Sequence, residues 1–337
     1  MGAPVISTIS KEIAIKIGRV ILGDRKVYAA LLKRGLQLRG IEKYYTATNK
    51  RINPPTKKTL IYMADGKYMH GGITDRIRAM ASAFLFAETH GMDFRIFHPS
   101  PFPLQQALIP NEVDWTIVEN ELSYHPDEAK PVLLYRDDFD NDQALELQLQ
   151  TSHRQYHLYS CIDSAGEKFP ELFHRLFKPA PALQQQVDAY REILGNNYCA
   201  ISFRFQNLLG DYREYTFKSL DEQKKAALIS QAVQAFNHLS QDNSAYDKLL
   251  VTADSPSFLE IMKKVPRTVT VFGKSLHIDF NPSGKFEDFA KAFVEFLLIA
   301  EAKEVYFYSN KNFRTYPSNF PRYAAKLGNI PFRTFGD

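Results

Sequence analysis

Short apolar runs alternate with longer amphipathic stretches from residue 59 onwards, and this alternation predicts strands connected by helices. Residues 59–63 and 93–97 form two apolar runs, and residues 75–88 carry strong helix formers with one broad apolar face. The order strand, glycine-containing loop, helix, strand predicts a βαβ unit. Further strands of this half are predicted at 115–118, 132–135 and 157–160.

The same alternation starts again after a proline-containing stretch. Residues 169–182 hold three prolines and are predicted to cross from one domain to another. A short helix is predicted over 183–194 and a buried strand over 199–203. The remaining predicted strands are 248–252, 269–271, 276–279 and 305–308, and the remaining predicted helices are 220–239, 257–264, 286–300 and 319–326.

Chain length agrees with this division, because 337 residues exceed the usual size of one domain. Two halves that both alternate strands and helices predict an α/β fold with two Rossmann-like, doubly wound domains that face each other across a cleft. A proline pair after Asn53 marks an earlier boundary. The predicted organisation is a basic N-terminal segment over 1–56, an N-terminal domain over 57–182 and a C-terminal domain over 183–337.

Composition narrows the class of protein. Hydrophobic residues make up 45% of the chain and charged residues 24%, which is ordinary for a globular protein with a core. No apolar run approaches the roughly 18 residues of a spanning helix, and the first residues lack the pattern of a secretory signal. The two cysteines, Cys161 and Cys199, are far apart, which argues against a disulfide framework and a zinc site. These features predict a cytoplasmic protein.

Positive charge is concentrated near the N-terminus. Residues 1–58 hold thirteen Lys or Arg and three acidic residues, whereas the rest of the chain carries more acidic than basic residues. Apolar residues are interleaved with these cations, so residues 11–51 predict a basic, helical, amphipathic extension. Such a segment can lie on an anionic surface at the inner face of the cytoplasmic membrane, or it can pack on the protein with a solvated basic face. Nucleic acid is not a predicted partner, because the basic excess is confined to one end.

Two predicted strands of the second half end in residues suited to a phosphate-bearing ligand. Arg204 follows the first of them and offers a planar charged group that matches phosphate oxygens, although it can also pair with a carboxylate. Asp254 follows the second, where a carboxylate can accept hydrogen bonds from a nucleotide. The alternative is that Asp254, Ser255 or Ser257 caps the next helix.

A third strand end and a glycine loop complete the candidate chemistry. Ser309 and Ser318 precede a predicted helix start, which suits a bound anion. In the first half, Gly71 and Gly72 allow a ligand to approach the backbone, and Asp75 can cap the following helix. Neither a G-x-G-x-x-G nor a Walker motif is present, which argues against a dinucleotide enzyme and an ATPase. Because ligands of open α/β sheets bind beyond the strand ends, these residues together predict a nucleotide-diphosphate site.

These segments resemble the motifs shared by bacterial α-1,2-fucosyltransferases, α-1,6-fucosyltransferases and protein O-fucosyltransferases. The three C-terminal motifs are similar to residues 202–207, 253–259 and 318–328, and the loop over 71–76 is similar to the G-G-L-G-D-R of many relatives. The resemblance extends over about residues 60–330. It implies a GT-B fold, a nucleotide-sugar donor bound by the second domain, an acceptor held largely by the first, and neither a metal nor another cofactor.

The resemblance also implies residue roles. Arg204 would neutralise the β-phosphate of the donor as the sugar leaves, Asp254 would contact the guanine or ribose, and Ser309 or Ser318 would contact the pyrophosphate. The implied donor-binding set is Arg204, Asn207, Asp254, Ser255, Ser309, Ser318 and Phe320, and the implied acceptor or cleft loop is Gly71, Gly72, Asp75 and Arg76. The chain departs from the pattern at Ser202, where the family has histidine, and at Phe205, where it has a second basic residue.

Transfer of a sugar from a nucleoside diphosphate needs positive charge at the leaving phosphate and a carboxylate that takes the acceptor's proton. Arg204 supplies the charge, and Asp211, then Glu214, are the predicted catalytic bases, with Asp75 as a first-half alternative; each can instead pair with a neighbouring cation. The predicted protein is an inverting, metal-independent glycosyltransferase that moves fucose from GDP-fucose to a glycan, lipid-linked or free, in surface polysaccharide biosynthesis. The alternatives are a different nucleotide-sugar donor, or a non-catalytic scaffold that binds glycan or nucleotide.

Overall fold

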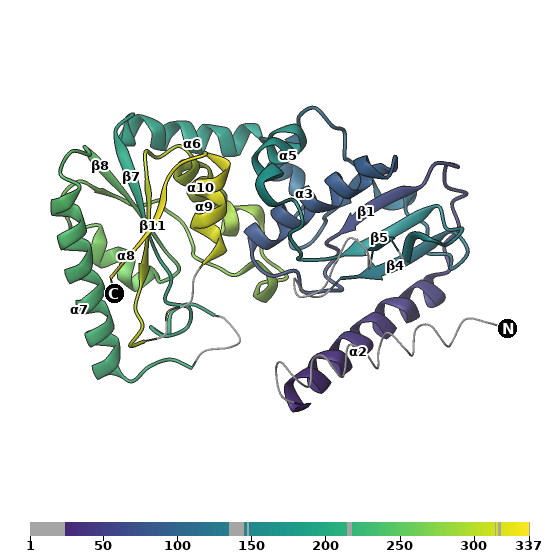
Figure 1. Cartoon of the computed structure of the whole chain (residues 1–337), viewed down its shortest axis with the longest axis horizontal. Coiled ribbons are helices and arrows are strands. Elements are labelled where there is room, and N and C mark those ends of the chain that lie inside the picture. The colour runs from purple at the N-terminus through teal and green to yellow at the C-terminus, as the bar shows by residue number, and fades with distance from the viewer. Residues whose placement is uncertain are drawn as a thin grey trace.

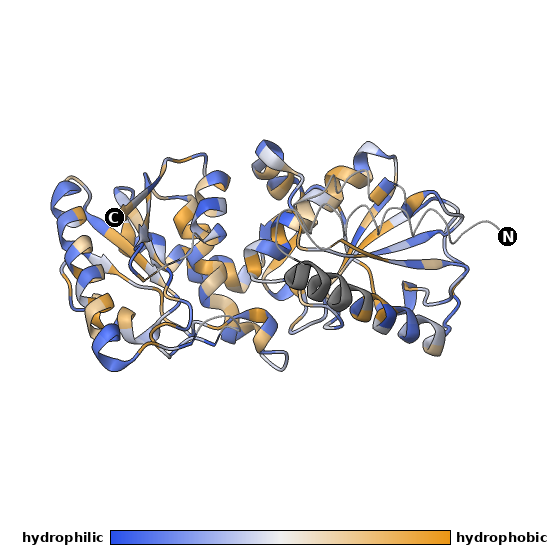
Figure 2. Ribbon diagram, turned by 60° about the horizontal axis from the view of Figure 1, so that its bottom comes forward, coloured by the Kyte–Doolittle hydropathy of each residue, from blue (hydrophilic) through white to orange (hydrophobic). Residues whose placement is uncertain are grey.

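A computed structural model of the chain describes residues 24–134, 145–146, 148–213, 218–313, 315 and 318–336. Two parallel sheets lie side by side along the long axis of the molecule, and several helices lie between them (Figure 1). Hydrophobic residues are concentrated on the strands and on the helices at the junction of the two halves (Figure 2). The predicted α/β fold with two doubly wound sheets is confirmed.

The first sheet has four parallel strands in the order β2-β1-β5-β4. Their bounds are β1 Thr59–Met63, β2 Asp93–Phe97, β4 Ala129–Leu133 and β5 Gln155–Tyr159, and helix α3 (Ile73–Thr89) connects β1 to β2. Every residue of β1 and β5 is buried, which is expected for parallel strands covered on both faces. The strand order reverses between β1 and β5, so the loops after these two strands form the switch point of this half.

The second sheet has five parallel strands in the order β11-β10-β7-β8-β9. The bounds are β7 Tyr198–Phe203, β8 Lys248–Ala253, β9 Thr268–Val269, β10 Val305–Ser309 and β11 Phe332–Gly336, and the helices are α6 Pro181–Leu194, α7 Glu222–Asp242, α8 Pro256–Met262, α9 Phe286–Ala300 and α10 Asn319–Leu327. This is the doubly wound order, and it reverses between β7 and β10. The loops after β7 and β10 therefore flank the place where such sheets bind ligands.

Helix α2 (Asp24–Thr48) lies along the first sheet (Figure 1). Ile41 and Tyr45 are buried against this sheet in one cluster with Ile61, Met63 and Tyr159. The last turns of α2 are therefore packed on the protein. Among the residues that the structure describes, no helix combines the length and apolarity needed to cross a membrane.

Aromatic side chains join the two halves into one hydrophobic cluster. The ring of Phe102, from the first half, lies 5.5 Å from Phe289 and 5.6 Å from Phe286 of α9, centroid to centroid. A second contact joins the ring of Phe169 to that of Tyr323 on α10 at 5.1 Å. Phe102 and Phe169 are both fully buried, so the junction is a core rather than a wet interface.

The stretch over 169–182, which is predicted to cross from one domain to the other, is itself folded. This stretch contains helix α5 (Phe169–Leu176) and strand β6 (Phe177–Pro179), which pairs antiparallel with β3 (Leu108–Pro110). Pro170 is tolerated because it lies in the first turn of α5, where its missing N–H would have no helical partner. Prolines here begin helices instead of marking an irregular linker.

Two predicted strands are also absent from the described structure. Residues 115–118 form only an isolated bridge, Ile96 to Thr116, before the 3₁₀ turn Glu119–Glu121. Residues 276–279 lead into the 3₁₀ turn Ile278–Phe280. The side-chain amide of Asn281 donates to the carbonyl of His277 at 2.8 Å and stabilises this turn. The remaining 3₁₀ turns are Leu104–Gln106 and Gly166–Lys168.

Candidate functional site

The polar strand ends of the second half meet at one edge of the sheet. Phe203 pairs with Ala253 in the ladder of β7 and β8, so Arg204 and Asp254 follow side by side. The Nη1 atom of Arg204 lies 3.8 Å from Oδ2 of Asp254, and 23% of the Arg204 side chain is exposed against 8% for Asp254. Ser309 ends β10, which pairs with β7 on its other side. The structure thus brings together the arginine, aspartate and serine expected from the sequence.

Asp254 fixes the loop that carries Arg204. Its two carboxylate oxygens accept hydrogen bonds from the backbone N–H groups of Phe205 and Gln206, both at 2.8 Å. Gln206 has a φ of 55°, a left-handed conformation that costs energy for a residue other than glycine. The two bonds to Asp254 stabilise this turn. A contact of Asp254 with guanine or ribose stays a prediction.

The residues after Asp254 follow the capping alternative. Ser255 is the N-cap of α8, and its hydroxyl accepts the N–H of Phe258. One oxygen of Asp211 accepts the hydroxyls of Ser255 and Ser257, each at 2.7 Å, and the N–H of Ser257 at 2.9 Å. Asp211 therefore ties the loop after β7 to the first turn of α8. The predicted catalytic base Glu214 lies outside the described residues.

The third motif begins helix α10. Ser318 is the N-cap of this helix and accepts the N–H of Phe320 at 3.3 Å. The Phe320 ring lies 5.7 Å from the ring of Phe296, so it packs on the core at the start of α10. Asn207 lies in the turn after β7, where its carbonyl accepts the N–H of Gly210 at 3.0 Å. The predicted contacts of these residues with a donor stay predictions.

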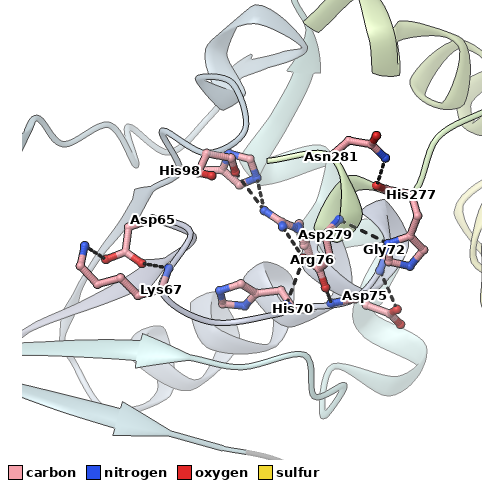
Figure 3. A network of polar contacts seen from close by, with 12 residues as sticks. Asp65, Lys67, His70, Gly72, Asp75, Arg76, His98, His277, Asp279 and Asn281 are labelled. Carbon is pink, nitrogen blue, oxygen red and sulfur yellow. Dashed lines mark hydrogen bonds and ion pairs between the residues drawn. The ribbon is translucent and has the colours of Figure 1, made fainter. Parts of the chain in front are cut away.

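The glycine loop of the first half is bound by a carboxylate of the second half (Figure 3). The N–H of Gly71 donates to Oδ2 of Asp279 at 2.6 Å, and Nη2 of Arg76 donates to Oδ1 at 2.7 Å. Gly71 has a φ of 83°, and a Cβ there would lie 2.5 Å from Oδ2 of Asp75, so this position requires glycine. Arg76 and Asp279 are 7% and 4% exposed, respectively.

Further contacts hold Arg76 in place. Its Nη1 atom donates to Nε2 of His98 at 3.0 Å and to the carbonyl of Ser100 at 3.2 Å. His98 must be neutral to accept this bond, and burial together with the charge of Arg76 lowers the pKa of His98 to about 3. Arg76, predicted to lie in an acceptor loop, thus joins the two halves; an acceptor contact stays a prediction.

Asp75 of the same loop faces the second half. Its Oδ2 accepts the N–H of Gly72 at 3.1 Å, which caps α3, and its Oδ1 lies 3.1 Å from Nη2 of Arg78. From the second half, Asn319 and the charge of Arg204 both lower the pKa of Asp75. Burial raises the pKa of Asp75, although each of these four neighbours lowers it.

Two aromatic side chains complete the surroundings of Arg204. The guanidinium carbon lies 5.8 Å from the centre of the Tyr212 ring, and that ring lies 6.4 Å from the ring of His277. Burial and the charges of Arg204 and Arg76 lower the pKa of His277 to about 4, although Asp279 opposes this shift. Sequence reasoning did not assign His98, Tyr212 or Asp279 to this site, because they lie outside the motifs, and it did not name Asn319, although this residue lies within the motif over 318–328.

The departures from the family pattern occur at buried positions. Ser202 is buried within the sheet, where its hydroxyl accepts that of Thr252 at 3.0 Å. Phe205 is fully buried, with its ring 4.8 Å from the ring of Phe258. An apolar side chain fits this position, and Arg204 remains the basic residue of the motif at the strand end.

The arrangement can bind an anion and position a hydroxyl group. Arg204 offers charge-assisted hydrogen bonds at the switch point, and the first turn of α10 offers backbone N–H groups. Asp75 provides a carboxylate on the opposite half. Within the described part of the chain, no three His, Cys, Asp or Glu side chains are grouped so that they could hold a metal ion.

Comparisons with known proteins agree with this architecture. No protein-family model and no curated protein matches the sequence. The structure of the α-1,6-fucosyltransferase NodZ from Bradyrhizobium soaked with GDP-fucose aligns with a TM-score of 0.51 at 16% identity, over 80% of this chain and 92% of that one. A mutant of Arabidopsis thaliana FUT1 in complex with GDP aligns with a TM-score of 0.52 at 13% identity, over 88% and 78% of the two chains. These likenesses show that the chain shares the GT-B fold of these proteins.

Proposed function

We propose that this protein, which has the GT-B fold of fucosyltransferases, transfers fucose from GDP-fucose to a hydroxyl group of a glycan. The observation that carries the proposal is Arg204, a partly exposed arginine at the switch point of the second sheet, beside Asp254 and next to the end of β10. Proteins with this fold have been solved with GDP and with GDP-fucose, which supports a donor of this kind.

The proposed reaction needs no covalent intermediate. The acceptor oxygen forms a bond to the anomeric carbon while the bond from that carbon to the β-phosphate oxygen breaks, with inversion. Arg204 stabilises the negative charge that grows on the leaving phosphate, and the N–H groups at the start of α10 add to this effect. A carboxylate takes the proton of the acceptor hydroxyl.

The acceptor and the cellular setting are part of the same proposal. We assign the acceptor to a surface polysaccharide or its lipid-linked precursor, and we place the protein in the cytoplasm with contact to the membrane through residues 11–51. Residues 11–51 hold eleven Lys or Arg, which supports that contact, since each cation near an anionic surface contributes about 1 kcal/mol. Flotation of the full chain with anionic vesicles at low salt should show binding that neutral vesicles or high salt abolish. Equal flotation with both lipids, or with neither, contradicts this part of the proposal.

Calorimetric titration is the direct test of the donor site. The full chain is titrated in EDTA with GDP, GDP-fucose, GDP-mannose, UDP and ADP. We expect GDP and GDP-fucose to bind without a metal and UDP and ADP to bind far more weakly. Preference for another nucleotide would change the donor, and no nucleotide binding would discard the transferase proposal. Binding of GDP-fucose without any GDP release over long incubation would favour the non-catalytic scaffold.

A further inference from the structure

Asp75 is the carboxylate of the first half that meets the candidate donor residues of the second. It lies in the first turn of α3, and its Oδ1 lies 3.1 Å from Nη2 of Arg78, whose guanidinium carbon is 5.7 Å from the centre of the Tyr323 ring of α10. Its side chain is 30% exposed, so a ligand at this junction can reach it. The loop of Arg204 approaches the same junction from the opposite half, because the guanidinium carbon of Arg204 lies 5.8 Å from the Tyr212 ring and that ring lies 6.4 Å from the ring of His277.

Three other carboxylates near this junction, all within the described residues, have fixed partners. Asp279 is 4% exposed and binds both Arg76 and the N–H of Gly71. Asp254 is 8% exposed and binds two backbone N–H groups of the loop after β7. Asp211 accepts three hydrogen bonds on one oxygen from the first turn of α8. Each of these three carboxylates is thus held by hydrogen bonds from another segment of the chain.

We propose that Asp75 is the general base that takes the proton of the acceptor hydroxyl; this inference rests on the proposed sugar transfer. As the acceptor oxygen bonds to the anomeric carbon, its proton passes to a carboxylate oxygen of Asp75. The electron pair of the breaking carbon–oxygen bond stays on the β-phosphate, and GDP leaves beside Arg204.

The surroundings of Asp75 suit this role. Burial raises its pKa, and a carboxylate that binds protons more readily is a better base near neutral pH. Arg78, Arg204, the N–H of Gly72 and Asn319 act in the opposite direction and lower the pKa.

The test compares Asp75→Asn with the wild type in the full chain. Asparagine still accepts the N–H of Gly72, so the cap of α3 is retained, but it cannot take a proton. Asp221→Asn is the matched control: the Asp221 carboxylate caps α7 through the N–H of Lys224, and Asp221 is not among the residues assigned to this site. Two nucleophiles are compared with GDP-fucose as the donor: water, which must lose a proton, and azide, which has none to lose.

We expect Asp75→Asn to bind GDP as the wild type does and to hydrolyse GDP-fucose about 10²–10⁴-fold more slowly, with GDP release as the measurement. Formation of fucosyl azide should be unchanged, and Asp221→Asn should match the wild type in both reactions. Hydrolysis at the wild-type rate would overturn the assignment. So would a parallel loss with water and azide, or a loss confined to Asp211→Asn. If the wild type neither binds GDP nor hydrolyses GDP-fucose, the proposed function itself fails, which is a separate result.

Discussion

Two arginines mark the two halves of the junction, and their surroundings differ. Arg76 of the first half is 7% exposed and binds Asp279, His98 and the carbonyl of Ser100 through both terminal nitrogens. Arg204 of the second half is 23% exposed, and its Nη1 atom lies 3.8 Å from the Asp254 carboxylate. Both residues fall in segments that the sequence predicts to be functional, Arg76 in the first turn of α3 and Arg204 directly after β7. The structure separates an arginine that holds the protein together from one that a ligand can reach.

The difference shows how arginine serves two purposes on the two sides of the junction. A buried guanidinium needs a counter-charge and hydrogen-bond acceptors, because an unpaired buried charge is costly. A partly exposed guanidinium with a longer ion pair can exchange water for phosphate oxygens at lower cost. Removal of each arginine should therefore affect a different property of the protein.

The largest expected effect is on stability, from Arg76→Ala. This change leaves the buried Asp279 carboxylate without its cation, so the free energy of unfolding should fall by about 3–5 kcal/mol. Urea unfolding measures it. Arg191→Ala, which removes an exposed ion pair with Glu301, is the control and should cost about 1 kcal/mol or less. Equal losses in the two variants would contradict the structural role of Arg76.

Arg204→Ala should affect ligand binding instead. Loss of a charge-assisted hydrogen bond to phosphate, about 1.5–3 kcal/mol, should weaken GDP binding by roughly ten- to a hundredfold. Calorimetry measures the affinity, with Arg322→Ala on the exposed side of α10 as an arginine control in the same half. GDP affinity equal to the wild type in Arg204→Ala would remove the basis of the proposed donor site.

The pH dependence of the free energy of unfolding should show that His98, which accepts a hydrogen bond from Arg76, is neutral in the folded protein. The pKa of His98 is about 3 in the folded protein against an ordinary 6.5, so only the unfolded chain takes up this proton as the pH falls below about 6.5. His98 should thus reduce the free energy of unfolding by about 1.4 kcal/mol per pH unit between these values. In His98→Gln, which keeps an acceptor for Arg76 but does not titrate, unfolding measured at pH 6, 5 and 4 should show a slope shallower by this amount. Parallel slopes in the two proteins would mean that His98 is charged when folded.

The smallest expected effect is on stability, from the loss of a helix N-cap in the second half. Ser255→Ala removes the N-cap of α8 and one hydrogen bond to Asp211, so we expect a loss of about 1 kcal/mol in the free energy of unfolding. Ser318→Ala, at the N-cap of α10, should cost a similar amount. A loss far above this value at Ser255 alone would show that its bond to Asp211 contributes more to the free energy of unfolding than a helix cap does.

Much of the fold could be predicted because the spacing of hydrophobic residues along the sequence indicates which side chains are buried. Strand β2 and helix α9 begin and end at the predicted residues, since one face or both faces of each element are apolar. The same signal failed at residues 276–279, because a short apolar run does not distinguish a strand from a buried turn. The hydrogen bonds of the turn decide between them, from the N–H of Phe280 and the side-chain amide of Asn281 to the carbonyl of His277.

The candidate site was predicted where strand ends carry polar residues. The ion pair of Arg204 and Asp254 follows from two parallel strands in register, which the order of motifs along the chain already indicates. The bond between Arg76 and Asp279 joins residues 203 positions apart in the sequence. Nothing local in either segment identifies the other, so this part of the site needed the structure.

The aromatic contacts of Phe102 and Phe169 bear on how the molecule moves. Because these rings lie in a cluster shared with α9 and α10, a hinge rotation that separated the two sheets would expose them to water. The cost of burying such rings makes wide opening unfavourable, at about 25 cal/mol for each square ångström of apolar surface exposed. We therefore expect substrate entry and product release to depend on loop rearrangements, and the two halves to melt in a single cooperative transition.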